Sequence, residues 1–166
     1  MALINIKDID PSILSASEFR QYKVCCAALY YYYNRDQMGY TFGGTSPFKP
    51  PPYVPPSLDC TKFIHYCFQV AGSPDPSGTG HFNGNTESLW RSGVLVGGSG
   101  VKAGMLHPGD IVFYGYGSTM VGGKNEHASL YIGDGKIVSH GQDSGPLFYD
   151  YTKGDKPVVG ARRYQF

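Results

Sequence analysis

The middle of the chain carries the sequence Asp59-Cys-Thr-Lys-Phe-Ile-His-Tyr-Cys-Phe-Gln-Val-Ala-Gly72. Asp59 is a residue type that caps helix N-termini, and Gly72 is one that commonly follows helix C-termini. Between them, apolar side chains recur at positions 63, 64, 67, 68 and 71, which is the spacing of one helix face. The stretch therefore predicts an amphipathic helix from Asp59 to about Ala71 that packs by one face against the rest of the fold.

Cys60 falls in the first turn of this predicted helix. Unpaired backbone N–H groups and the helix dipole favour negative charge there, so we expect a lowered thiol pKa and a nucleophilic thiolate. The alternative is a small buried apolar side chain, which is how we interpret the mid-helix residues Cys25, Cys26 and Cys67. The N-terminus lacks the apolar core of a signal peptide, so we expect all four thiols to be free.

The flanking sequence predicts a second helix and a sheet. Ser15-Ala-Ser-Glu18 is a capping box that opens a helix to about Tyr33. A short helix is expected at 86–91, and strands are expected at 110–114, 127–132, 136–140 and 158–164. Helices first and strands afterwards predict an α+β fold, in which N-terminal helices pack on a small, mostly antiparallel β-sheet or barrel.

Gly133-Asp134-Gly135 predicts a tight hairpin between two of these strands. If Asp134 and Gly135 form a two-residue turn, His140 lies opposite Ser129 and shares its face with His127. The two imidazoles are then diagonal neighbours within hydrogen-bonding reach. A one-residue change of register places them on opposite faces. With Cys60 they would supply a nucleophile, a base and an orienting group, whereas the alternative is two half-buried histidines with structural hydrogen bonds.

Composition restricts the class of protein. The chain has 166 residues, which suits a single domain over 1–166 with an N-terminal arm at 1–14. Net charge is +1 and only 16% of residues are charged, which argues against nucleic-acid binding. No apolar stretch approaches the roughly 20 residues of a membrane span. Cys60, His65 and Cys67 lack a recognised zinc-ligand spacing, so no metal or other cofactor is expected.

Five short blocks occur in an order that resembles the NlpC/P60 family of papain-like cysteine peptidases. They are Tyr40-Thr-Phe-Gly-Gly44, Leu58-Asp-Cys-Thr-Lys-Phe63, Pro108-Gly-Asp-Ile-Val-Phe113, His127-Ala-Ser-Leu-Tyr-Ile-Gly-Asp-Gly135 and Ile137-Val-Ser-His140. The resemblance implies that Cys60 is the nucleophile, His127 the general base and His140 the third member of a triad. It also implies substrate-binding positions at Tyr40, Asp59 and Thr61. From the residues alone, Asp59 is equally well explained as a helix cap and Tyr40 as a packing residue.

The resemblance implies a hydrolase that cuts an amide bond in the stem peptides of bacterial peptidoglycan. Thr61-Lys62 departs from the Ser-Gly that usually follows the nucleophile, and a long proline-rich loop separates Gly44 from Asp59. The loop at 72–84 and the C-terminal Arg162-Arg-Tyr164 are similar to peptidase modules of bacteriophage endolysins. We therefore expect a monomer that is made in the host cytoplasm and acts at the cell wall. The alternatives are a catalytically silent peptidoglycan-binding module and a papain-like acyltransferase.

Overall fold

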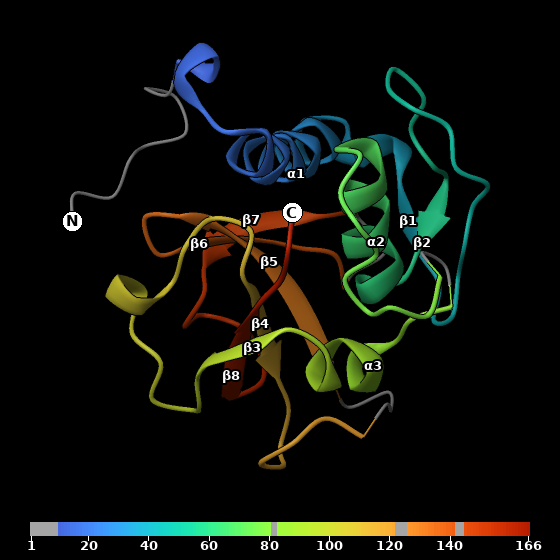
Figure 1. Ribbon diagram of the computed structural model, residues 1–166. Coiled ribbons are helices and arrows are strands. Elements are labelled where there is room, and N and C mark those ends of the chain that lie inside the picture. Colours follow the sequence, from blue (N-terminus) through green and yellow to red (C-terminus); the bar gives the residue numbers. More distant parts are fainter. Residues whose placement is uncertain (1–9, 81–82, 122–125, 142–144) are drawn as a thin grey trace.

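The computed structural model describes residues 10–80, 83–121, 126–141 and 145–166 (Figure 1). The α-helices are α1 (Ala16–Tyr33), α2 (Cys60–Val70) and α3 (Thr86–Arg91), and 3₁₀ turns lie at Pro11–Ile13, Arg35–Gln37 and Ala103–Met105. The strands are β1 (Gly39–Tyr40), β2 (Ser57–Leu58), β3 (Val94–Gly97), β4 (Ile111–Tyr114), β5 (His127–Gly133), β6 (Lys136–Ser139), β7 (Leu147–Asp150) and β8 (Val158–Arg163). Most of the predicted arm, residues 1–9, lies outside the described residues. No helix of the described part is long and apolar enough to cross a membrane.

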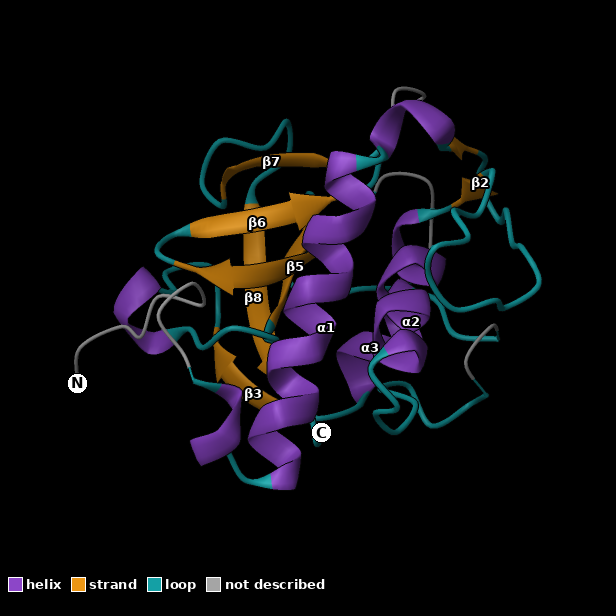
Figure 2. Cartoon of the chain, turned by 90° about the horizontal axis from the view of Figure 1, so that it is seen from above, coloured by secondary structure: helices purple, strands orange, loops and turns teal. Residues whose placement is uncertain are grey.

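The main sheet has the strand order β3-β8-β4-β5-β6-β7, and every neighbouring pair in it is antiparallel. Helices α1 and α2 lie across one face of this sheet (Figure 2). This arrangement confirms the predicted α+β fold. The edge strands β3 and β7 were not expected from the sequence. Neither strand alternates regularly between buried and exposed residues, which is the pattern by which a half-buried strand is recognised.

The two predicted helix starts are confirmed. Ser15 Oγ accepts a hydrogen bond from Glu18 N at 3.2 Å, and the Glu18 carboxylate accepts one from Ser15 N at 2.8 Å. This reciprocal pair is the capping box that begins α1. At α2, the Asp59 carboxylate accepts a hydrogen bond from Lys62 N at 2.7 Å. The helix therefore begins at Cys60, as the capping residue predicts.

Both faces of the sheet are buried, and successive strand residues alternate between them. Phe113, Ala128 and Leu130 pack with α1 and α2 in the main core. Their neighbours Tyr114 and Tyr131 pack in a second cluster on the opposite face, which we call the outer face. His127 pairs with Tyr114, so strand alternation assigns His127 to the outer face.

The predicted register of the β5–β6 hairpin is wrong by one residue. The two-residue turn is present: Gly133 pairs with Lys136, and Asp134 and Gly135 both have positive φ, 52° and 72°. The register then shifts between Tyr131 and Gly133, so that Leu130 pairs with Val138. Such a bulge moves every later residue to the other face. Ser139 therefore lies opposite Ser129, and His127 and His140 lie on opposite faces of the sheet.

Candidate active site

The predicted nucleophile and all three predicted substrate-binding residues meet at the N-terminus of α2. The short parallel pairing of β1 with β2 aligns Tyr40 with Leu58, one residue before the cap Asp59. Thr61 Oγ1 donates a hydrogen bond to Asp59 Oδ1 at 3.0 Å. This capping arrangement holds the first turn of α2 rigid and aims its backbone N–H groups at the space in front of Cys60.

A cleft of about 430 Å³ opens at this helix terminus. Its lining includes Tyr40, Asp59, Cys60 and Thr61, together with Glu126 from the segment before β5. Neither His127 nor His140 borders it. The structure thus brings the predicted cysteine and the predicted substrate-binding residues to one cleft. The two predicted histidines are not part of its lining.

The Cys60 thiol does not have the lowered pKa that the sequence predicts. Its side chain is buried, and burial, followed by the negative charge of Asp59, raises the pKa to about 12. The backbone amides of Ala128, Thr61 and Cys60 itself act in the opposite direction but do not outweigh these two causes. Cys60 is therefore a neutral thiol at neutral pH. Its reaction as a nucleophile requires a base that removes the proton.

His127 bonds to one serine hydroxyl, which in turn is bonded to a second serine. Its Nε2 lies 2.6 Å from Ser139 Oγ, and Ser129 Oγ donates to the same Ser139 oxygen at 2.8 Å. A Cβ atom on Gly141 would stand only 2.9 Å from His127 Cε1, so a side chain at this position would push against the ring. Burial, then the charges of Lys156 and His140, lower the His127 pKa to about 4. The imidazole is neutral at pH 7 and able to accept a proton.

His140 has different partners from those predicted. Its Nε2 donates to the Gly39 carbonyl at 3.1 Å, and its ring packs against Tyr40 and Phe63 with centroid distances of 5.5 Å to each. Burial lowers its pKa, which the carbonyl of Gly39 partly offsets. These contacts tie β1 to the sheet and to α2. His140 therefore fixes the position of Tyr40, and no hydrogen bond joins it to His127 in the described residues.

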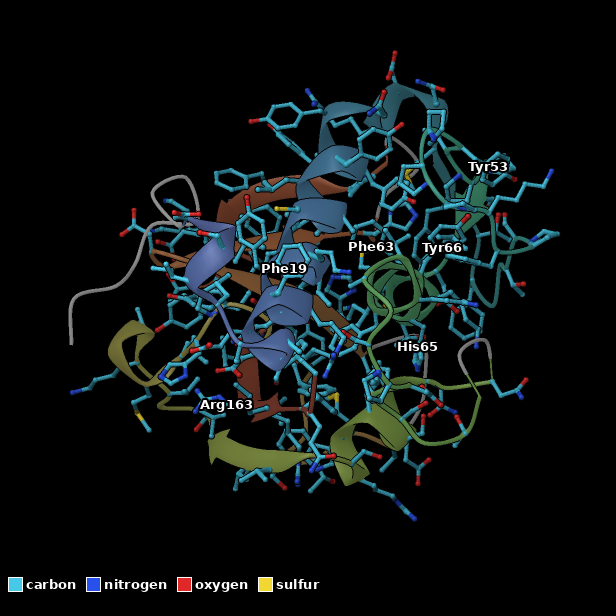
Figure 3. All side chains as sticks on the ribbon, turned by 45° about the horizontal axis from the view of Figure 1, so that its top comes forward. Phe19, Tyr53, Phe63, His65, Tyr66 and Arg163 are labelled. Atoms are coloured by element: carbon cyan, nitrogen blue, oxygen red, sulfur yellow. The ribbon has the colours of Figure 1, made fainter. Side chains whose placement is uncertain are left out.

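The sequence did not predict the side chains that hold the cleft wall. Lys62 is almost fully buried, and its Nζ donates to the Gly84 carbonyl at 2.6 Å. His65, which has no exposed surface, bonds through Nδ1 to Thr61 O at 2.6 Å and through Nε2 to Ser77 Oγ at 2.8 Å. In Figure 3 the His65 side chain points from α2 towards the segment that follows this helix. This anchoring role has no local sequence signal, because Gly84 and Ser77 lie in loops 22 and 12 positions away along the chain.

The Cys60 sulfur and the start of β5 are close together. The backbone amide of Ala128 acts on the Cys60 thiol, and Ala128 directly follows His127 in β5. In the described residues no hydrogen bond joins the thiol to either imidazole, a geometry that is common in enzymes without bound substrate. No group of three or more His, Cys, Asp or Glu side chains among the described residues is placed to hold a metal ion.

A cysteine at the N-terminus of a helix that packs on an antiparallel sheet defines an α+β fold of the papain-like class. The sequence profile of the NlpC/P60 family matches residues 37–156. The chain belongs to the NlpC/P60 family.

Individual relatives agree with this assignment. The chain is 28% identical over 127 residues to a probable endopeptidase p60 of Listeria welshimeri, which covers 75% of this chain and 19% of that protein. It is 41% identical over 70 residues to the gamma-DL-glutamyl hydrolase of Bacillus subtilis, which covers 40% of this chain and 16% of that protein. The chain thus spans less than a fifth of the length of these two relatives.

Solved structures show the same fold. NlpC1 of Trichomonas vaginalis superimposes with a TM-score of 0.58 at 18% identity, covering 93% of this chain and 46% of that one. The peptidoglycan hydrolase RipB of Mycobacterium tuberculosis superimposes with a TM-score of 0.56 at 18% identity, covering 92% of this chain and 69% of that one.

Proposed function

We propose that this chain is a cysteine hydrolase that cuts an amide bond in the stem peptides of bacterial peptidoglycan. The observation that carries the proposal is Cys60, placed at the capped N-terminus of α2 in a cleft beside the start of β5. Support comes from the relatives named as endopeptidases and as a gamma-DL-glutamyl hydrolase, and from the family to which the chain belongs.

The proposed mechanism starts from a neutral thiol and a neutral imidazole. His127 removes the proton from Cys60 as the sulfur attacks the substrate carbonyl, forming the S–C bond and an oxyanion. The backbone N–H of Cys60, at the helix terminus, donates to that oxyanion. The imidazolium then protonates the leaving nitrogen as the C–N bond breaks. Water, deprotonated by His127, hydrolyses the thioester and restores the thiol.

The positioning role in this mechanism goes to Ser139. An orienting group must bond to the nitrogen of the base that does not face the thiol. Ser139 bonds to His127 Nε2 in this way, which leaves Nδ1 to exchange the proton with Cys60. His140, the residue implied by the resemblance, is bonded to Gly39 instead. Its proposed role is to hold Tyr40 in place at the cleft.

The cleft suits a peptide that carries a positively charged amine. Two acidic residues, Asp59 and Glu126, line it, and Tyr40 borders the same space. Among the described residues of this lining the only lysine is Lys62, and it is bonded to the Gly84 carbonyl. We therefore propose Tyr40, Asp59 and Thr61 as substrate-binding residues, with an amine of the stem peptide as the recognised group.

The test is the Cys60→Ala variant assayed on purified peptidoglycan. Wild-type protein should release new amino groups, and mass spectrometry of the fragments should identify the amide bond that is cut. Cys60→Ala should release none, while the matched control Cys26→Ala, on α1 and outside the cleft, should keep its activity. Equal activity of Cys60→Ala and wild type would contradict the proposal. Wall binding without hydrolysis by wild-type protein would indicate the silent binding module instead.

We propose that the activity serves host lysis, as in bacteriophage endolysins, with the protein made in the host cytoplasm. This rests on the sequence similarity of the 72–84 loop and the C-terminal segment to endolysin peptidase modules. Expression in a bacterial host should cause lysis only when a membrane pore former is expressed with it. Lysis without the pore former would contradict this part of the proposal.

A further inference from the structure

A second hollow, of about 80 Å³, lies on the outer face of the sheet and is separate from the cleft that contains Cys60. His127 and Ser139 form one side of it, and Tyr149 and the turn at Gly154 and Lys156 form the other. Adjacent residues line the two hollows: Glu126 borders the cleft, and the next residue, His127, borders the second hollow.

Lys156 brings a positive charge to this second hollow. Its side chain is partly buried, and in the described part of the chain it makes no hydrogen bond or ion pair. Its charge is the second cause, after burial, of the lowered His127 pKa. The neighbouring Asp155 also borders the hollow but is exposed and forms no ion pair with it. Because no described carboxylate pairs with it, this ammonium can form a charge-assisted hydrogen bond with a bound anion.

The proposed reaction places a defined part of the substrate near this charge. His127 must protonate the leaving nitrogen, so the peptide on the leaving side of the bond has to pass next to its ring. The hollow has room for a carboxylate with a few waters, since each water needs about 10–15 Å³ of such space. A carboxylate is also the anionic group that peptides themselves supply.

We propose that the hollow is a subsite in which Lys156 binds a carboxylate carried by the leaving part of the substrate. This inference rests on the proposed hydrolase function and adds to it a preference at the leaving side. It also has a consequence for the base. When a carboxylate pairs with Lys156, the positive charge next to His127 is neutralised, and the imidazole accepts the Cys60 proton more readily. Binding of the correct substrate thereby favours the proton transfer.

The experiment uses two stem peptides that differ only in a carboxylate or a carboxamide on the leaving residue. Wild-type protein should show a kcat/KM for the carboxylate peptide about tenfold higher, as expected for one charged hydrogen-bonded pair. In Lys156→Gln this ratio should fall to about one, and Lys156→Arg should keep most of it. Lys153→Gln is the matched control, because Lys153 lies in the same loop but is exposed and does not border the hollow; its ratio should equal that of wild type.

Two results overturn the subsite: equal rates on the two peptides with wild-type protein, or an unchanged ratio in Lys156→Gln. Failure of the proposed function looks different, since neither peptide is then cut. In that case the decisive measurement is calorimetric binding of the amine-bearing carboxylate fragment to Cys60→Ala protein, with and without Lys156→Gln. Binding that Lys156→Gln weakens about tenfold supports the subsite, and binding that it leaves unchanged refutes it.

Discussion

His127 and Ser139 face each other across the β5–β6 pair, with Nε2 of the imidazole 2.6 Å from the serine Oγ. The bulge between Tyr131 and Gly133 creates this relationship, because it brings Ser139 opposite Ser129 on the outer face. Without the bulge, the next residue, His140, would occupy that position. One inserted residue thus exchanges the expected imidazole for a hydroxyl as the group that orients the base.

Ser139→Ala should lower kcat by about 10- to 100-fold, which is less than the roughly 100- to 10,000-fold that a general base contributes, because Ser139 only orients that base. The KM should change less than kcat, because Ser139 does not border the cleft that contains Cys60 and only forms part of one wall of the second hollow. Ser139→Thr, which keeps the hydroxyl, should restore part of the rate. Ser129→Ala is the control: it removes a hydrogen bond to Ser139 but none to His127. An equal loss in both alanine variants would indicate general damage to the hairpin rather than positioning of the base.

As the pH is lowered, kcat/KM should begin to fall only at an unusually low pH. Activity requires neutral His127, and burial, Lys156 and His140 lower the pKa of this residue to about 4. The rate should therefore persist as the pH falls and decline only near pH 4, far below the ordinary histidine value of about 6.5. Lys156→Gln removes a positive charge, so its acid limb should move to higher pH. Rates measured from pH 3.5 to 8, with circular dichroism as a check on folding, test this. A wild-type limb between pH 6 and 7 would contradict it.

Helix starts and the hairpin turn could be predicted from the sequence, because they depend on residues that are neighbours in the chain. The capping box at Ser15 and Glu18, the cap at Asp59 and the turn at Asp134 and Gly135 each involve residues at most three positions apart, and each is present. The position of Cys60 follows from the same information, because it depends only on where α2 begins.

Features that depend on distant packing were not predicted. The bulge before Gly133 has no residue signature of its own, since that glycine already belongs to the turn signal. The raised pKa of Cys60 arises from burial by the fold, which opposes the local effect of the helix terminus. The Lys62–Gly84 hydrogen bond joins residues 22 positions apart. In each case the deciding interaction links segments whose relative placement only the complete fold defines.

Asp59→Asn should make the Cys60 thiol more reactive without loss of stability. The Asp59 charge is the second cause of the raised thiol pKa, and asparagine caps a helix about as well as aspartate. Alkylation of Cys60 by iodoacetamide at pH 8.5, followed by peptide mass spectrometry, should be several-fold faster than in wild type. Asp59→Ala is the comparison, because it also removes the charge but loses the cap, at a cost of about 1 kcal/mol in the free energy of unfolding. Unchanged alkylation in Asp59→Asn would refute the electrostatic cause.

Gly84→Ala should destabilise the cleft wall. A Cβ atom there would stand 2.6 Å from Ser77 Oγ and even closer to the His65 ring, and both groups are fixed by hydrogen bonds to each other and to α2. Overpacking of this kind costs about 1–3 kcal/mol, which urea unfolding can measure. The displaced wall should also raise the KM, because Gly84 borders the cleft with Cys60. Gly98→Ala is the matched control, since no atom lies within 4 Å of its Cβ position, and it should leave both quantities unchanged. Equal stability of the two variants would show that the His65 network yields to the added methyl group and does not hold the wall.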